Sequence, residues 1–234
     1  MKAKIFVIEC LTNLHVGNGD VNFNIIDNEV ERDVVTGFPT INSSGVKGAL
    51  RAFFEENKLL SNINGIFGSD ENGSTTSGAL KFLSANLLAL PIRSISGGDK
   101  PYSIHAPKTA CEDFKKMLKN FQLEDVSIED IKGGDEKITL DEDNSCYEKD
   151  GLPVIARNSV GEQTNLWYEE VVPHKSIFYF AVVTSTSEAD DLLDVFTESV
   201  RGKIIQFGAN ASVGYGLCKV IKVISENEEG ANNG

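Results

Sequence analysis

Residues 36–54 read TGFPTINSSGVKGALRAFF, and the spacing of their apolar side chains predicts a helix. Intervals of three and four residues place five apolar side chains on one face: Val46, Ala49, Leu50, Phe53 and Phe54. A hydroxyl of Ser43 or Ser44 can cap the first turn. Lys47 and Arg51 lie one turn apart on the opposite face, near a helix N-terminus whose free N–H groups attract anions. This arrangement suits a phosphate group.

The sequence around this helix predicts an α+β fold. A second helix begins at Ser187-x-x-Asp190 and buries Leu192, Leu193, Phe196 and Val200. Strand-like apolar runs flank the two helices at residues 4–11, within 79–92, and at 177–183, 203–207 and 217–224. Strand, helix, strand, repeated once, is the pattern of a ferredoxin-like (RRM-like) core.

Several segments interrupt this pattern within one domain spanning residues 1–234. A long polar loop occupies residues 12–42, and 61–78 has the composition of a flexible loop. Residues 111–150 form an acidic insertion with 13 acidic and 6 basic side chains. An amphipathic helix at 112–123 opens this insertion, with Phe114, Met117, Leu118 and Phe121 on its apolar face. The polar tail 225–234 is expected to be disordered.

Composition excludes several classes of protein. With 234 residues, 41% of them hydrophobic, the chain can bury a sizeable core. It has no apolar run of about 20 residues and no cleavage signal, so we expect a soluble cytoplasmic protein with no membrane partner. Its four cysteines are scattered without a C-x-x-C pair, which favours free thiols over disulfides or zinc ligands.

The net charge of −13 argues against a nucleic-acid-binding protein, because phosphate neutralisation needs Lys and Arg. Most of this charge lies outside the helix described above. Residues 111–150 contribute −7, and residues 188–234, with 8 acidic and 4 basic side chains, contribute −4. We therefore expect weak RNA affinity in the isolated chain and stronger binding when several copies line one strand.

Four motifs occur in an order that resembles the RAMP superfamily of CRISPR proteins. They are Thr36 to Arg51, Leu90-Pro91-Ile92-Arg93-Ser94, Leu166-Trp167-Tyr168-Glu169-Glu170 followed by Pro173, and the glycine-rich run from Gln206 to Gly216. Within that superfamily they resemble the repeated backbone subunit of the type III-B (Cmr) effector complex, a ribonucleoprotein of antiviral defence. The resemblance implies a ferredoxin-like core with a projecting thumb at 155–175.

The resemblance also implies a function. The family member binds guide RNA and cleaves complementary target RNA at regular intervals. Its partners are further copies of itself in a helical backbone and other Cmr-type effector subunits. Asp27 matches the aspartate that the family needs for cutting. In physical terms its carboxylate can ligate a divalent metal such as magnesium, or take a proton from an RNA 2′-hydroxyl. A loop aspartate can also simply cap backbone amides.

Other residues are candidates for a role beside Asp27. His15 can move a proton or contact a phosphate near neutral pH, although a lone histidine is more often structural. Glu169 and Glu170 can join Asp27 around an ion or position the phosphate, or they can form a solvated acidic face. Trp167 and Tyr168 can stack on bases or pack within the protein.

Serine hydroxyls and backbone amides can bind a guide strand without a dense lysine patch. Glycines let main-chain N–H groups approach phosphate closely, although any tight strand connection has the same composition. The predicted RNA-binding residues are Ser43, Ser44, Lys47, Arg51, Arg93, Ser94, Trp167, Tyr168, Gly208, Asn210, Gly214 and Gly216.

Two other functions remain open at this stage. One is a guide-binding scaffold that keeps every RNA contact and cuts nothing. The other is an endonuclease that matures the precursor guide with His15 as acid or base. The motif at Leu166 to Glu170 speaks against the second of these.

Overall fold

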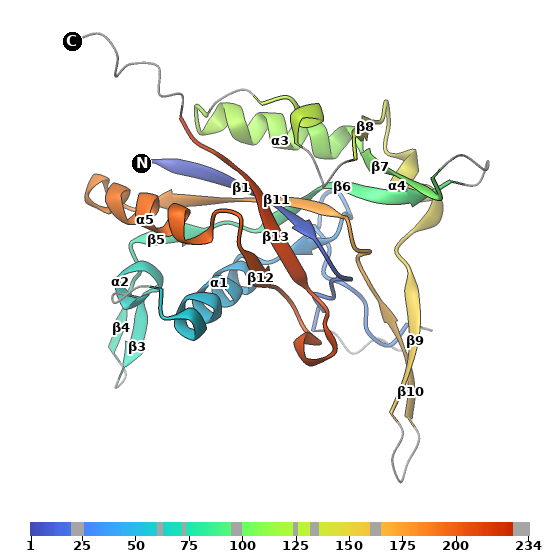
Figure 1. The fold of residues 1–234 in the computed structure, drawn as a ribbon, viewed down its shortest axis with the longest axis horizontal. Coiled ribbons are helices and arrows are strands. Elements are labelled where there is room, and N and C mark those ends of the chain that lie inside the picture. The colour runs from blue at the N-terminus through green and yellow to red at the C-terminus, as the bar shows by residue number, and fades with distance from the viewer. Residues whose placement is uncertain are drawn as a thin grey trace.

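The computed structural model describes residues 1–19, 26–59, 63–71, 74–94, 100–123, 126–131, 136–159 and 165–226. Residues 227–234 of the predicted tail and residues 160–164 of the predicted thumb lie outside these ranges. The fold is mixed α+β and is built around a central sheet (Figure 1). None of the helices in these ranges combines the length and apolar content that crossing a membrane requires.

Four long antiparallel strands form the centre of the sheet in the order β13-β1-β11-β6. Every residue of β1 and β11 is buried, which explains why both strands are mostly apolar on both faces rather than alternating. The long strands are β1 (Ala3–Cys10), β6 (Ala85–Arg93), β11 (Ile177–Thr184) and β13 (Leu217–Ile224). Shorter strands extend the sheet: β2 (Thr40–Ile41), β5 (Leu80–Phe82), β7 (Tyr102–Ala106), β8 (Ile138–Leu140) and β12 (Ile204–Gln206).

One face of the sheet packs on three helices through aromatic side chains. Phe6 stacks on Phe180 within the sheet, with ring centroids 5.3 Å apart. Phe54 and Phe196 stack at the same separation between two of the helices. These helices are α1 (Ser43–Asn57), α2 (Ile63–Phe67) and α5 (Asp190–Val200), which follows the short η2 (Ser187–Ala189). The two amphipathic helices predicted around the core strands are thus present.

The acidic segment 111–150 supplies side chains to the core on the opposite face. Phe114 and Leu118 are buried in one cluster with Ile5 and Val7 of β1, and Figure 1 shows α3 on the far side of the sheet from α1. Sequence spacing predicted Phe114 and Leu118 on the apolar face of the helix that opens this segment. Its elements are α3 (Lys108–Asn120), which begins four residues earlier than predicted, η1 (Ile128–Asp130), β8 and α4 (Ser145–Asp150).

Replacing Phe114 with Leu tests this core contribution. The ring of Phe114 meets Tyr179 edge-on at 4.9 Å, so the smaller side chain loses that contact and leaves a void. We expect a loss of about 1.5 kcal/mol in the free energy of unfolding, measured by urea denaturation. Val195→Ala, an exposed change on α5, should cost less than about 0.5 kcal/mol. Equal costs would show that Phe114 lies outside the core.

Two small hairpins lie apart from the central sheet. Residues 61–78, predicted as a loop, contain α2 and a hairpin of β3 (Ser69–Glu71) and β4 (Ser74–Thr76). The second hairpin pairs β9 (Val154–Ser159) with β10 (Asn165–Glu170) and points away from the body of the molecule (Figure 1). We call it the projecting hairpin; it lies at the position of the predicted thumb.

Two local predictions have different outcomes. The helix cap is wrong: α1 follows Asn42, whose carbonyl accepts the N–H of Val46, and no side chain caps its first turn. The cysteines are free thiols, and those of Cys10 and Cys218 are buried opposite each other with their sulfur atoms 3.6 Å apart.

Candidate active site

Asp27 lies beside the base of the projecting hairpin. Its backbone N–H donates to the carbonyl of Tyr168 at 3.0 Å, and its Oδ2 accepts the N–H of Tyr168 at 2.8 Å. The residue is exposed. Oδ2 is therefore fixed by the strand, while Oδ1 has no partner among the described residues. This carboxylate combines a fixed position with access from solvent, which a group acting on RNA requires.

Glu169 is buried at the centre of a polar network. Its Oε2 accepts a hydrogen bond from Arg157 at 2.7 Å, and its Oε1 accepts one from the side-chain amide of Asn210 at 2.6 Å. Nε2 of His15 lies 3.7 Å from the same Oε1. The carboxylate thereby joins the first loop, both strands of the projecting hairpin and the glycine-rich segment. Its partners favour a role in positioning these segments over direct contact with RNA.

Glu170 is buried and bonded to the segment that follows Asp27. One carboxylate oxygen accepts the backbone N–H of Val30 at 3.1 Å, and the other forms an ion pair with Arg32. The backbone N–H of Glu170 donates to the carbonyl of Asn28 at 2.9 Å. Glu170 therefore holds the residues that follow Asp27 against β10.

His15 is buried, and its ring is held by a hydrogen bond at one nitrogen. Nδ1 lies 2.8 Å from the carbonyl of Glu170, so this nitrogen carries the proton and donates it. Nε2 faces Glu169. The carbonyl of His15 also accepts the N–H of Ala209 at 2.8 Å. These contacts order the loop and give no access to solvent, which does not favour the precursor-processing alternative.

Trp167 and Tyr168 point to opposite faces of the projecting hairpin. Trp167 is partly buried beside the guanidinium of Arg157, which lies 5.8 Å from its ring centroid and 5.2 Å from that of Tyr215. Tyr168 is 40% exposed next to Asp27. The structure thus places Tyr168, rather than Trp167, where a base can stack beside the carboxylate.

The glycine-rich segment packs against the first loop through its backbone. A Cβ at Gly208 would lie 2.3 Å from the carbonyl oxygen of His15, and one at Gly216 would lie 1.8 Å from that of Phe207. Only glycine fits there. The N–H groups of Gly214 and Gly216 already donate to the carbonyls of Ala211 and Asn13. These two amides are therefore not available to phosphate.

The other predicted RNA-binding residues lie in two places. Ser43, Ser44 and Lys47 are exposed at the start of α1. Arg51 instead binds the carbonyl of Gly68 at 2.9 Å and pairs with Glu55 at 2.7 Å, so much of its charge is engaged within the protein. Two further residues, Arg93 and Ser94, line a separate groove of about 830 Å³ with Leu152, Pro173 and Lys175.

Comparison with known proteins decides the family. Residues 7–219 match the RAMP superfamily. The chain belongs to the RAMP superfamily. This RAMP protein is 26% identical to the CRISPR system Cmr endoribonuclease Cmr4 of Pyrococcus furiosus, in an alignment over 293 residues that covers 97% of this chain and 98% of that protein. It is also 38% identical to the CRISPR system CMR subunit Cmr4 of Saccharolobus solfataricus over 103 residues, 42% of this chain and 33% of that one.

Solved structures share the fold of this RAMP protein. A chain of the type III-B Cmr-beta complex bound to cognate target RNA matches with a TM-score of 0.74 and 19% identity, covering 96% of this chain and 97% of that one. Oligomeric Cmr4 from Pyrococcus furiosus matches with a TM-score of 0.65 and 21% identity, covering 97% of this chain and 99% of that one.

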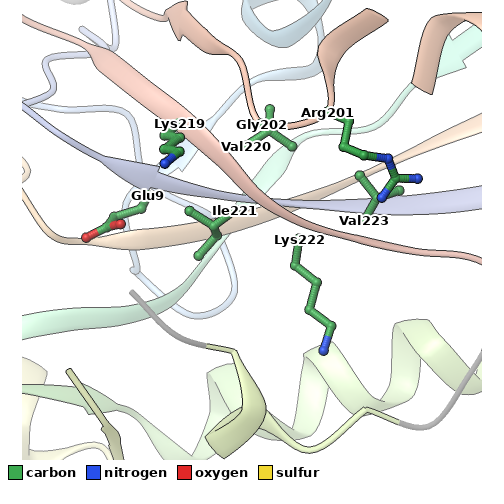
Figure 2. A pocket seen from close by; sticks show the side chains of 8 residues that line it. All are labelled: Glu9, Arg201, Gly202, Lys219, Val220, Ile221, Lys222 and Val223. Carbon is green, nitrogen blue, oxygen red and sulfur yellow. The ribbon is translucent and has the colours of Figure 1, made fainter. Parts of the chain in front are cut away.

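No group of three or more His, Cys, Asp or Glu side chains suited to a metal ion occurs within the described ranges. Glu169 and Glu170 face arginines rather than Asp27, so they do not complete such a group here. A hollow of about 500 Å³ lies elsewhere, between β13 and the end of α5, and contains none of the predicted site residues (Figure 2). Burial raises the pKa of Glu9 at its edge.

Sequence reasoning missed Arg32 and Arg157 in this RAMP protein. They pair with Glu170 and Glu169 across 138 and 12 residues of sequence. Each is a single arginine in polar sequence, with no periodicity or motif to mark it. Glu169 and Glu170 were the signal that such partners exist, because two buried carboxylates require two cationic partners.

Proposed function

We propose that this RAMP protein is a backbone subunit of a type III-B CRISPR effector that binds guide RNA and cleaves complementary target RNA at regular intervals. Its partners are further copies of itself and other Cmr-type subunits, and it acts in the cytoplasm. One observation carries the proposal. A chain alignable over nearly its whole length with a Cmr endoribonuclease presents an exposed, fixed carboxylate, Asp27, at the base of its projecting hairpin.

We also propose that the central strands form a ferredoxin-like core with the projecting hairpin as its thumb. The connection from β1 through α1 to β6 skips one strand position, which β11 fills. The connection from β11 through α5 to β13 skips the position of β1. These two split βαβ units support the proposal.

The mechanism follows from the position of Asp27. The thumb forces a nucleotide out of the guide–target duplex and breaks the stack, so the neighbouring target backbone can align its 2′-oxygen with phosphorus. Asp27 accepts the 2′-hydroxyl proton through Oδ1, the oxygen that has no partner within the described ranges. Attack of the 2′-oxygen on phosphorus then displaces the 5′-oxygen and leaves a cyclic phosphate. Tyr168 lies next to Asp27, where it can hold an adjoining base.

As the alternative to taking the proton, the same carboxylate oxygen can hold a magnesium ion. Mg²⁺ keeps several waters and often binds one or two carboxylates together with substrate phosphates, so it does not need a cage of protein ligands. Asp27 would hold it through Oδ1. The bound ion would supply positive charge that stabilises the phosphate in the transition state.

Cleavage by the assembled complex tests the function against the scaffold alternative. The complex is reconstituted with guide RNA and magnesium and mixed with end-labelled complementary RNA. We expect a ladder of evenly spaced products, since each copy cuts once, and a non-complementary RNA of equal length should stay intact. An intact complementary RNA that nevertheless binds the complex would establish the scaffold. Cleavage of repeat RNA by the isolated chain without metal would establish the precursor-processing enzyme.

A further inference from the structure

The segment that carries Asp27 is held by a side-chain clamp in which Arg32 and Tyr147 have no role assigned so far. After Asp27 the chain runs through Val30 and Arg32 towards α1. The guanidinium of Arg32 donates to three acceptors: the carboxylate of Glu170, the hydroxyl of Tyr147 and the carbonyl of Gly37. A guanidinium can satisfy several acceptors at fixed angles, so Arg32 fixes the relative positions of all three.

Tyr147 connects this clamp to the acidic segment. Its hydroxyl donates to the carbonyl of Gly37 at 3.1 Å, and its ring meets Phe38 edge-on with centroids 4.9 Å apart. The guanidinium of Arg32 also lies 5.9 Å from the Tyr147 ring centroid. One side chain of α4 therefore contacts the Asp27 segment through a hydrogen bond, a ring contact and a cation–π contact.

The helix that carries Tyr147 is itself anchored to the core. Asn144, immediately before α4, accepts the backbone N–H of Thr109 at 3.0 Å and donates to its hydroxyl at 2.8 Å. The N–H of Lys108 donates to the carbonyl of Asp143. Lys108 and Thr109 belong to α3, which packs on the sheet through Phe114. A continuous path of contacts thus runs from the sheet through α3 and α4 to Arg32.

We infer that Arg32, clamped by Tyr147 and Glu170, is a positioning residue for Asp27. The inference rests on the proposed function. It assigns a role to the acidic segment 111–150, which would hold the carboxylate of Asp27 in line with the target backbone. Tyr147 contacts only residues beyond Val30 from Asp27, namely Arg32, Gly37 and Phe38, so its loss moves the carboxylate without removing it. A displacement of about 1 Å in a reacting group can cost about 100-fold in rate.

The test measures single-turnover cleavage at saturating target in the reconstituted complex. We expect Arg32→Ala to lower the rate about 100-fold and Tyr147→Phe, which keeps the ring, to lower it about 10-fold, with the Kd for target RNA unchanged. Added guanidinium ion should restore part of the Arg32→Ala rate, whereas Arg32→Lys should stay slow because a lysine cannot donate in the same fork. Arg201→Ala is the matched control, since it removes an Arg charge elsewhere.

The possible outcomes distinguish failure of this inference from failure of the proposed function. A wild-type complex that binds target RNA and leaves it intact removes both. A wild-type complex that cuts, with Arg32→Ala and Tyr147→Phe cutting equally fast, overturns the clamp and leaves the function standing. Should Arg32→Ala fail to fold, Tyr147→Phe decides the matter alone. A rate loss matched by the same loss in target affinity would assign Arg32 to RNA binding and refute positioning.

Discussion

Asp27→Asn lowers the rate of target cleavage by about 10³-fold in our expectation, within the range that a general base contributes. Asparagine has almost the same shape, and its side-chain oxygen can still accept the N–H of Tyr168, so the segment keeps its place. What disappears is the negative charge that takes a proton or binds magnesium. Assembly and target affinity should therefore stay at wild-type values. The measurement is single-turnover cleavage of labelled target by the reconstituted complex.

The control for this variant is Asp191→Asn, the same chemical change in the first turn of α5. It should cut at the wild-type rate. Filter binding of labelled target to both complexes verifies that neither change weakens affinity. An Asp27→Asn complex that cuts as fast as wild type would remove Asp27 from the mechanism and move the search to Glu169 and Glu170.

The core strands and the two helices of the central sheet follow from sequence spacing, because apolar runs and three-to-four-residue intervals depend on burial alone. Phe54 and Phe196 were both placed on buried helix faces from spacing, and the structure stacks them together. Net charge marked 111–150 as an acidic segment, and the spacing of Phe114 and Leu118 was the signal that it also supplies buried apolar side chains. Phe114 and Ile128 are as buried there as any strand residue.

In the candidate site too, some features could be predicted from the sequence and others depend on contacts between distant segments. Asp27 was found through motif order, and its exposure agrees with a reactive group. The adjacent glutamates came with the motif, but their burial depends on Arg32 and Arg157, whose pairing arises only when distant segments fold together. Gly208 and Gly216 pack too closely on His15 and Phe207 for a side chain to fit, which no local pattern reveals.

The second large effect concerns stability. Replacing Glu169 with Leu should lower the free energy of unfolding by about 3 kcal/mol, because removal of one partner leaves the other charge buried without compensation. The carboxylate side chain is 4% exposed and that of Arg157 is 20% exposed, so water replaces the lost contacts poorly. Asn210 loses its acceptor as well. Equilibrium denaturation in urea measures the change.

A double-mutant cycle makes this prediction specific. Glu169→Leu combined with Arg157→Leu should cost less than Glu169→Leu alone, since no unpaired charge remains. Glu198→Leu is the matched control: its ion pair with Arg201 spans 3.1 Å between side chains that are 70% and 53% exposed, so its loss should cost less than about 1 kcal/mol. Equal costs for Glu169→Leu and Glu198→Leu would mean that the network around Glu169 contributes no more than a surface pair.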